Sequence, residues 1–387
     1  MTPTAGPPDN DGVTHVWIAG AGMTRFGRRS ESLPDLIAEA AQLALADARI
    51  ERPDAIVVGA MNPEEFTGDG NFGSLINTHL GLSQSPALRV ETATSSGLAA
   101  IYAGFAGIAA GLHRTILVVG GEKMTHMPTP RVSEIIGRSI DPHERRYGAT
   151  MPALAGLITR AAMHKHGLTL KEFSQVAVKN HANAARNPYA HFQEPVSLEE
   201  VMESRMVADP LRLYHCCPIS DGAAAVVLSA ERTPVRVAGI GQGTDTIAIR
   251  YRSDLTSFRA TQVAAQAAYR MAGFGPERVD VAELHDAFSP FEIISLEDTG
   301  LIPAGKAGRA TLEGQTALDG RLPVSPSGGL KARGHPLAAT GIGQVVELTW
   351  QLRGEAGSRQ VDARVGLVQS IGGLATNNWI LLLEAGR

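Results

Sequence analysis

The sequence lacks what several classes of protein depend on. Its 387 residues include only two cysteines, the adjacent Cys216 and Cys217, which provide neither a disulfide framework nor the ligand spacing of a metal site. The formal net charge of -4 argues against a strongly basic surface for nucleic acid. No apolar run reaches the roughly 18 residues that would indicate a membrane-spanning helix. We therefore expect a cytoplasmic protein without a metal, a nucleic-acid partner or a membrane span.

Small residues are abundant instead. The chain holds 42 glycines, and 44% of its residues are hydrophobic while only 5% are aromatic. This composition favours helices of small residues packed closely on a buried sheet, and the length suffices for one large or two medium domains. Residues 1–14 are polar and rich in proline and glycine, which predicts a disordered lead-in rather than a secretory signal.

An internal repeat organises the rest of the chain. The segment VWIAGAGMT (16–24) resembles VRVAGIGQG (235–243), and an amphipathic helix, a short loop with proline and an apolar strand follow each. The helix after Gly97 and the strand 115–121 likewise correspond to the helix 339–354 and the strand 365–373. Alternation of strands and helices predicts an α/β fold with parallel strands, here as two stacked sheets related by pseudo-twofold symmetry.

The repeat also suggests how the chain is divided. We assign residues 15–232 to a first half and 233–387 to a second half. The segment of about 122–215 has no counterpart of similar length in the second half, so we expect a long, partly helical insertion there. The apolar run in DGAAAVVLS (221–229) predicts a buried strand that closes the first half.

Two features that invite a functional interpretation have simpler explanations. Glycines follow the first strand in AGAGMTRFG, but the G-x-G-x-x-G spacing of dinucleotide sites is absent and the repeat partner is equally rich in glycine. A packing role is therefore favoured in both halves. Cys216 and Cys217 are interpreted as small buried residues, with a catalytic thiol as the less favoured alternative.

Three loops have the character of an active site. His335 lies in GHPLAATG, held between glycine and proline directly before a helix. His285 follows an apolar strand, at the carboxyl end where ligand sites of α/β sheets collect, although a capping contact with Asp286 is an alternative. The third loop is VETATSSGLAAI (90–101), where a strand ends in a tight turn and a helix begins. Helix-terminal N–H groups favour negative charge at such a turn.

Six ordered segments resemble the thiolase family, and within it the sterol-carrier-protein-x type of thiolase. They are GGEKM (120–124), KNHANAARNPYAHF (179–192), CCPISDGAAAVVLS (216–229), HDAF (285–288), SGGLKARGHPLAATG (327–341) and SIGGLATNNW (370–379). The resemblance implies a duplicated fold of five α/β/α/β/α layers. It also implies an inserted loop domain that covers a coenzyme A thioester, and a homodimer.

The same resemblance assigns roles to residues. The family pattern Cys-x-Ser-Gly aligns with Thr94-Ser95-Ser96-Gly97, so Thr94 takes the position of the nucleophilic cysteine. The second cysteine, in His-Asp-Cys-Phe, is Ala287 here, and SIGG replaces the Cys-x-Gly near the C-terminus. The catalytic positions implied are His335, His285 and Thr94, with Ser95 and Ser96 as alternative nucleophiles or pocket residues. The implied substrate-binding residues are Gly334, Ser327, Gly328, Gly372 and Gly373.

The chemistry of the residues at these positions favours one class of reaction. A cysteine is partly thiolate at pH 7, whereas a threonine hydroxyl needs a strong adjacent base. The two histidines could still act as oxyanion donors or as acid–base groups, which favours carbon–carbon bond cleavage or formation in an acyl-CoA thioester through an enolate. Coenzyme A would enter as part of the substrate, with no tightly bound cofactor. Thiolase-like steroid side-chain aldolases act with a small OB-fold, CoA-binding subunit, so the resemblance implies such a partner.

Two other functions remain open at this point. One is an acyltransferase of the acetyl-CoA acetyltransferase type that uses a hydroxyl at 94–96 or is completed by a partner subunit. The other is a non-catalytic scaffold subunit of a condensing complex, against which the retention of both histidines argues.

Overall fold

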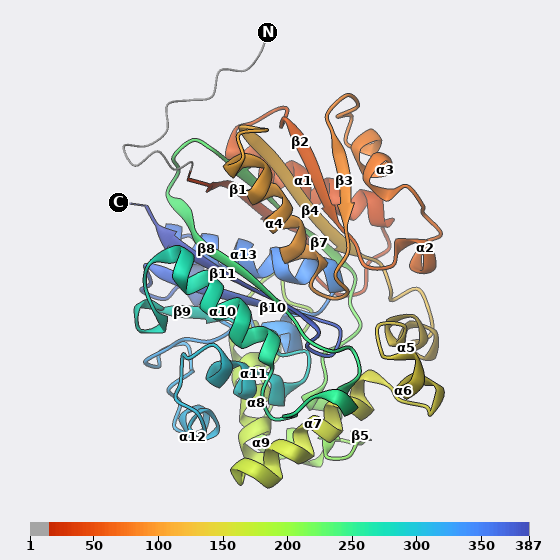
Figure 1. The fold of residues 1–387 in the computed structure, drawn as a ribbon, viewed down its shortest axis with the longest axis vertical. Coiled ribbons are helices and arrows are strands. Elements are labelled where there is room, and N and C mark those ends of the chain that lie inside the picture. The colour runs from red at the N-terminus through yellow and green to blue at the C-terminus, as the bar shows by residue number, and fades with distance from the viewer. Residues whose placement is uncertain (1–14, 387) are drawn as a thin grey trace.

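The computed structural model describes residues 15–386, and the predicted disordered lead-in of residues 1–14 lies outside the described part. Nine strands form its main sheet: β1 (Trp17–Met23), β2 (Ala55–Gly59), β3 (Ala87–Val90), β4 (Thr115–Glu122), β7 (Gly222–Ser229), β8 (Val235–Thr244), β9 (Val281–Glu283), β10 (Val365–Gly372) and β11 (Asn377–Ala385). Their order across the sheet is β3-β2-β4-β7-β1-β8-β11-β10-β9 (Figure 1). The first five belong to the first half of the repeat and the last four to the second.

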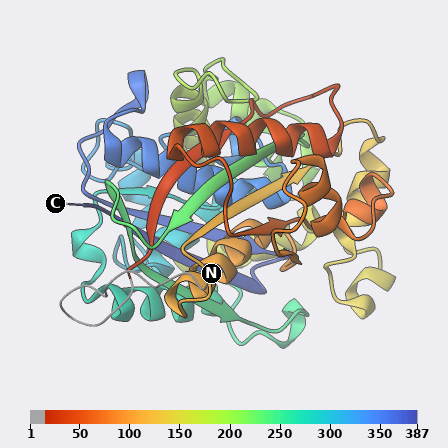
Figure 2. The same cartoon turned by 90° about the horizontal axis from the view of Figure 1, so that it is seen from above.

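Helices cover both faces of each part of the sheet. They are α1 (Leu33–Ala48), α2 (Pro63–Phe66), α3 (Phe72–His79) and α4 (Ser96–Ala109) in the first half, and α10 (Arg259–Ala272), α11 (Ser289–Asp298), α12 (Ala307–Leu312) and α13 (Leu337–Arg353) in the second. Helix α1 lies along β1 and β7 (Figure 2), and α10 packs on β8 and β11. Helices α4 and α13 contact each other, and α13 also contacts strands of both parts. The predicted α/β fold of five layers is thereby confirmed, with α4 and α13 as the central layer.

Two details of the sheet differ from the prediction. The two parts are not separate sheets, because Trp17 and Ile18 of β1 pair antiparallel with Arg236 and Val235 of β8. Strands β1 and β8 are equivalent in the repeat. A twofold rotation that relates them makes them run in opposite directions where they pair. The sheet is also mixed rather than parallel: β2 pairs in parallel with β3 and β4, whereas β7 runs antiparallel to β4 and β1. Strand β11, which was not predicted, returns antiparallel along β10 after a short turn.

The glycines of β1 and β8 serve packing, as predicted. A Cβ on Gly20 would lie 2.1 Å from the carbonyl oxygen of Ala44 in α1, and one on Gly241 would lie 2.1 Å from that of Ala264 in α10. Such distances are too short for any side chain, so glycine lets each helix lie directly on its strand. The same close packing of a helix on a glycine-containing strand occurs in both halves, so no nucleotide site is needed to explain these glycines.

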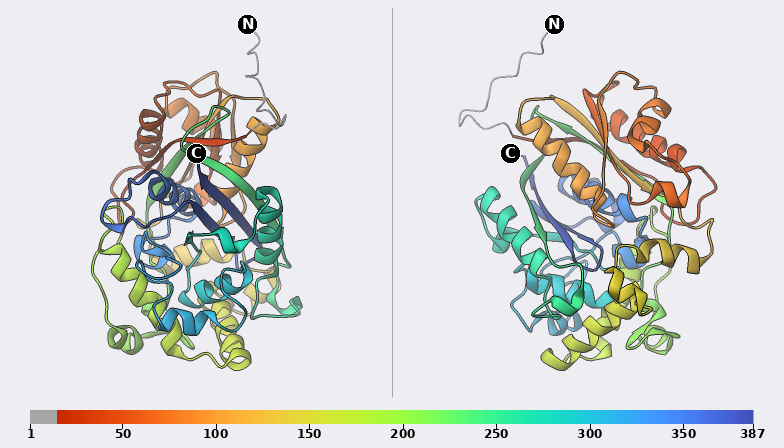
Figure 3. Two further views of the ribbon diagram at one scale, coloured as in Figure 1. Left: turned by 90° about the vertical axis from the view of Figure 1, so that its left-hand side faces the viewer. Right: turned by 45° about the vertical axis from the view of Figure 1, so that its right-hand side comes forward.

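The segment predicted as an insertion is mainly helical. It contains α5 (Thr129–Gly137), α6 (Pro142–Arg146), α7 (Met151–His166), α8 (Leu170–Ala184), α9 (Leu198–Glu203), the short pair β5 (Met206–Ala208) and β6 (Leu211–Arg212), and the 3-10 turn η1 (Leu213–His215). Helix α8 packs against α11 and α12 of the second half (Figure 3). The remaining short elements are η2 (Ile249–Tyr251), η3 (Pro276–Arg278), η5 (Gly357–Arg359) and the π-helical turn η4 (Gly329–Arg333).

Helix caps set the bounds of the elements that position the site. Helix α1 begins after Ser32, whose side chain accepts a hydrogen bond from the N–H of Asp35. Helix α13 begins directly after Pro336 and ends at Gly354, which has a φ of 76°. Among residues 15–386, no helix has the length and apolar character needed to cross a bilayer.

Candidate functional site

The turn between β3 and α4 is sharp and strained. Ala93 has a φ of 54°, a left-handed conformation that costs energy for a residue with a side chain. This conformation is followed immediately by Thr94, and α4 begins at Ser96. Thr94, Ser95 and Ser96 are all buried, with exposed fractions of 6%, 0% and 0%. The sequence thus correctly predicts a strand, a tight turn and a helix here.

All three hydroxyl groups of this turn donate to backbone carbonyls. Thr94 Oγ1 donates to the carbonyl oxygen of Ile371 at 2.6 Å, and Ser96 Oγ donates to that of Ala93 at 2.6 Å. Ser95 Oγ donates to the carbonyl of Thr92 at 2.7 Å. Within residues 15–386, none of these hydroxyls is hydrogen-bonded to an imidazole or a carboxylate. A general base that could activate them is therefore missing from their contacts.

The two predicted histidines meet in space although they come from different loops. His285 follows β9, and His335 stands just before α13. Their rings are 5.1 Å apart between centroids and are nearly perpendicular, at 89°. Both are buried, with exposed fractions of 2% and 5%.

Each ring is held through its Nδ1 atom. The N–H of Ile371 donates to Nδ1 of His285 at 3.2 Å, and Nδ1 of His335 lies 2.7 Å from Thr340 Oγ1. A backbone N–H can only donate, so Nδ1 of His285 must be the unprotonated nitrogen and its ring proton is on Nε2. His285 therefore presents an N–H donor on the side of the ring that faces away from Ile371.

Residue Ile371 joins the histidines to the turn before α4. Its carbonyl oxygen accepts from Thr94 while its N–H donates to His285. The next residue, Gly372, packs against the same turn, because a Cβ there would lie 2.3 Å from the carbonyl oxygen of Thr92. The structure thus brings Thr94, His285, His335 and Gly372 into one contiguous site between the two halves of the fold.

Burial keeps both imidazoles uncharged. Desolvation, together with the nearby charge of Arg333, lowers the pKa of His335 to about 3. The pKa of His285 is well below its ordinary value, first through desolvation and then through His335 and Arg333. At neutral pH both rings are neutral, so they act as hydrogen-bonding groups and not as cations.

The other predicted binding residues have different surroundings. Gly334 has a φ of 110° and packs against Ser220 and His191, and Gly373 lies beside Thr376. Ser327 donates to Glu283 through its N–H and its hydroxyl, and Gly328 packs closely against Ala184. These last contacts shape the loop before His335, and a role of any of these residues in binding substrate stays a prediction.

Several groups at the site were not predicted from the sequence. Thr340 holds His335, and Ile371 acts through its backbone, which no residue type reveals. Glu122 is fully buried and accepts hydrogen bonds from the N–H groups of Met61, Asn62 and Ala338. Desolvation raises its pKa to about 7. The sequence singled out Glu122 only through its place in the segment GGEKM. That segment does not indicate which N–H groups bind the carboxyl group.

The two cysteines do not supply the thiol that the turn lacks. Burial raises the pKa of Cys216 to about 11 and that of Cys217 to about 12, so both thiols stay protonated at neutral pH. Cys217 donates its N–H to the carbonyl of Ala287, and both cysteines pack beside a hydrophobic cluster that includes Ile371. Both side chains are only partly buried, so the interpretation of this pair as small buried residues is correct in their apolar packing but not in full burial.

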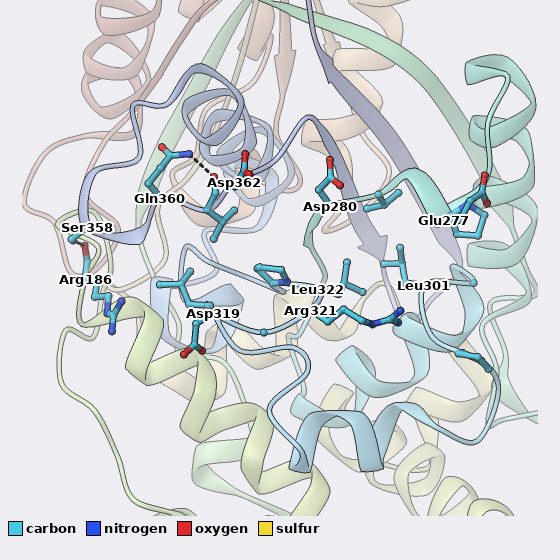
Figure 4. A pocket seen from close by; sticks show the side chains of 18 residues that line it. Arg186, Glu277, Asp280, Leu301, Asp319, Arg321, Leu322, Ser358, Gln360 and Asp362 are labelled. Carbon is cyan, nitrogen blue, oxygen red and sulfur yellow. Dashed lines mark hydrogen bonds between the residues drawn. The ribbon is translucent and has the colours of Figure 1, made fainter.

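A large cleft lies elsewhere on the molecule. It has a volume of about 940 Å³ and is lined by segments that precede β9 and β10 and by the loop 318–323. Figure 4 shows that Arg186, Asp319 and Asp362 surround it. None of the predicted site residues lines this cleft, so its size does not identify the functional site.

Comparison with known proteins finds one family along nearly the whole chain. The family model "Thiolase, N-terminal domain" matches residues 16–232, and "Thiolase C-terminal domain-like" matches residues 241–385. An acetyl-CoA acetyltransferase of Methanothermobacter thermautotrophicus is 44% identical over 371 residues, which cover 92% of this chain and 96% of the relative. Sterol carrier protein 2 of Bos taurus is 37% identical over 382 residues, which cover 92% of this chain and 70% of the relative.

A solved structure extends the similarity. The "Ltp2-ChsH2(DUF35) aldolase" superposes with a TM-score of 0.82 and 26% sequence identity, covering 97% of this chain and 99% of the other. The relatives thus include proteins named for acyl transfer and one named as an aldolase.

Proposed function

The chain belongs to the thiolase superfamily, and from this premise we propose that it cleaves or forms carbon–carbon bonds in acyl-CoA thioesters through an enolate, without a covalent acyl-enzyme. The observation that carries the proposal is the combination of two neutral histidines in contact with each other and three hydroxyls at 94–96 that all donate to backbone carbonyls. The site offers donors for a developing oxyanion but no activated nucleophile.

The reaction that suits such a site is retro-aldol cleavage of a 3-hydroxyacyl-CoA. The β-hydroxyl proton is removed, the bond between Cα and Cβ breaks to leave a carbonyl compound, and the thioester enolate then takes up a proton at Cα. His285 would donate a hydrogen bond from its Nε2–H to the enolate oxygen, since Ile371 fixes that tautomer. His335 would be the second donor, or it would accept the proton of the β-hydroxyl as the bond breaks and return it to Cα of the enolate. A preorganised donor of this kind is worth roughly 3 kcal/mol, or a hundredfold in rate.

Coenzyme A is part of the substrate in this proposal, and no resident cofactor is required. The structural similarity to a protein named as an Ltp2-ChsH2(DUF35) aldolase supports a second subunit, which we propose to be a small OB-fold, CoA-binding protein. A homodimer is also part of the proposal, on the strength of family membership.

A second function is favoured by a different observation. The 44% identity to an acetyl-CoA acetyltransferase supports acyl transfer by a hydroxyl at Thr94, Ser95 or Ser96. The hydrogen bonds of these hydroxyls count against it, because each would have to leave its carbonyl and find a base. A non-catalytic scaffold is the third candidate, and the retained histidine pair counts against that one.

A product assay separates these candidates. The purified full chain is incubated with a branched 3-hydroxyacyl-CoA, and separately with a 3-ketoacyl-CoA and free CoA, while mass spectrometry follows the products. We expect the hydroxy thioester to be cleaved to a shorter acyl-CoA and a carbonyl compound, and His335→Ala to lower that rate about a hundredfold. Thiolysis of the ketoacyl-CoA would contradict the proposal and support acyl transfer. No product in either arm would favour either the scaffold or an enzyme that needs the proposed second subunit, and repeating the assay with that subunit added separates the two.

Binding provides the control for this assay. Calorimetry with acetyl-CoA should detect binding to both the wild-type chain and His335→Ala. Absence of binding up to millimolar acetyl-CoA would contradict the proposed substrate class itself.

A further inference from the structure

Arg333 is a buried cation whose hydrogen bonds are incomplete. It ends the π-helical turn η4, two residues before His335, and its exposed fraction is 0%. Its Nη2 donates to the carbonyl oxygen of Thr340 at 3.4 Å, whereas Nε and Nη1 have no hydrogen-bond partner among the described residues. A buried guanidinium normally makes several hydrogen bonds, so a group left this poorly satisfied needs an explanation.

The nearby carboxylates only partly balance its charge. The closest is Glu283, whose Oε2 is 3.6 Å from Nη1 of Arg333 and already accepts the hydroxyl of Ser327. Glu347 is engaged on both oxygens by Nε of Arg359, at 2.9 Å each. The Arg333 guanidinium also lies over the ring of Phe26, at 5.5 Å from the centroid. Much of the positive charge of Arg333 therefore remains available to act on its other neighbours.

Those neighbours are the two histidines of the site. The charge of Arg333 opposes protonation of both His285 and His335. Arg333 is also linked to His335 by contact, because it donates to the backbone of Thr340, whose hydroxyl holds Nδ1 of His335. Arg333 thus affects both the orientation of the His335 ring and the charge of the two imidazoles.

Neutrality matters at His285 for a geometric reason. Protonation would put a hydrogen on Nδ1, which would then face the N–H of Ile371 at 3.2 Å. Two donors cannot share a hydrogen bond, so the contact that connects His285 to the segment holding Thr94 would break.

We propose that Arg333 is a positioning residue that fixes His335 through Thr340 and adds to the effect of burial in holding His285 and His335 uncharged. The assignment deepens the proposed function, since neutral imidazoles are what an oxyanion site of this design requires. The charged and titratable groups that act on His285 are His335 and Arg333, and the one that acts on His335 is Arg333. Those that act on Arg333 are Glu283, Glu347, Asp286 and Arg359. The carboxylate of Glu122 accepts the N–H of Ala338 at the start of α13.

The test measures the charge of each ring and not the activity, so it does not depend on the proposed reaction. The full chain is labelled with 15N at the histidine rings, and His285 and His335 are assigned by loss of their signals in His285→Gln and His335→Gln. Spectra at pH 7 and pH 5 are compared for wild type, Arg333→Lys and Arg333→Met. Circular dichroism at both pH values confirms that each protein is folded. A double variant, Arg333→Met with Glu283→Gln, also replaces the carboxyl group nearest to Arg333, so that this group is not left buried without its partner.

In the wild type, both rings should be neutral at pH 5. Arg333→Met and the double variant should raise the imidazolium population of His335 at pH 5 about tenfold, equivalent to a shift of its titration by about one pH unit. Arg333→Lys, which keeps the charge, should stay within about twofold of the wild type, a rescue that a purely structural role would not give.

Three results would overturn the proposal. They are a charged His285 or His335 in the wild type at pH 5, no increase in imidazolium in a folded variant without the Arg333 charge, or equal increases in the lysine and methionine variants. The wild-type spectrum alone decides the first of these, whatever the stability of the variants. Normal cleavage of a 3-hydroxyacyl-CoA alongside any of them would reject the role of Arg333 and leave the proposed function in place.

Discussion

At the scale of single residues, the direction of the hydroxyl protons separates this site from a nucleophile–base pair. A serine or threonine nucleophile works when an imidazole accepts its proton, and here the proton of Thr94 is directed at the carbonyl of Ile371. The histidines are directed at Ile371 and Thr340. Each group is hydrogen-bonded, but not to a partner that would activate it for covalent catalysis.

The variant Thr94→Val tests whether the hydroxyl of Thr94 acts as a nucleophile. Valine keeps the shape of threonine and removes the hydroxyl, so we expect turnover of a 3-hydroxyacyl-CoA within a few-fold of wild type. Loss of the buried hydrogen bond should lower the free energy of unfolding by about 1 kcal/mol. Steady-state kinetics and urea denaturation measure the two effects.

Ser95→Ala and Ser96→Ala are the matched controls, because they remove the neighbouring hydroxyls one at a time. If one of the three variants is folded but loses more than about a hundredfold in turnover, that hydroxyl acts as a nucleophile and the non-covalent account is wrong.

Candidate residues could be singled out from the sequence where a short motif marks them, and their catalytic roles stay a prediction. His285, His335 and Thr94 each stand in a short segment with turn residues on one side and a predicted strand or helix on the other. Their connections could not be predicted in the same way. Thr94 is 277 residues from Ile371, and the link uses a carbonyl oxygen that every residue carries. Thr340 and Arg333 flank His335 in sequence, but only the fold turns their contacts toward it.

At the scale of elements, the start of α13 depends on a buried carboxylate. Glu122 at the end of β4 accepts the N–H of Ala338 in the first turn of α13 and two N–H groups from the loop after β2. It thereby joins three segments next to His335. Desolvation raises its pKa from 4.5 to about 7, so the folded chain holds this proton at pH values where the unfolded chain has released it.

This raised pKa predicts a pH dependence of stability with a definite sign. Between about pH 4.5 and pH 7 the folded state binds more protons than the unfolded state, so the contribution of Glu122 to the free energy of unfolding falls as the pH rises. Glu122→Gln has no such proton to lose. The free energy of unfolding of the variant minus that of the wild type should therefore increase from pH 5 to pH 7.5, by up to about 3 kcal/mol.

Chemical denaturation at several pH values measures this difference, and contributions from Glu283 and the histidines cancel in the subtraction. Glu134→Gln, which removes an exposed carboxylate on α5, is the surface control. A difference that is constant with pH, or one that decreases, would show that Glu122 is already ionised in the folded chain at pH 5.

At the scale of the whole molecule, the site exists only because two repeated halves face each other. Thr94 comes from the first half, and both histidines and Ile371 come from the second. The central helices approach so closely that a Cβ on Gly97 of α4 would lie 2.2 Å from the carbonyl oxygen of Ala338 in α13. This contact sets the turn that carries Thr94 directly beside the helix that follows His335.

The duplicated architecture could be predicted from the sequence because the repeat is visible in the pattern of strands, helices and glycines. The joining of the two parts of the sheet could not, since it rests on a two-residue pairing of Trp17 and Ile18 with β8. The parallel strands of the strand–helix–strand units could be predicted. The antiparallel direction of β7 could not, for the same physical reason that β11 was missed. A short turn and a long crossover both connect strands, and apolar patterning does not distinguish the resulting directions.

The measurement that tests the central claim most directly is the mass, during turnover, of the peptide that carries Thr94, Ser95 and Ser96. The protein is mixed with a branched 3-hydroxyacyl-CoA, quenched in acid while product forms, and digested to release the peptide that spans residues 90–101. The account predicts product without any acylated peptide. An acyl group on Thr94, Ser95 or Ser96 that appears and disappears at the rate of turnover would contradict it and establish a covalent acyl transfer.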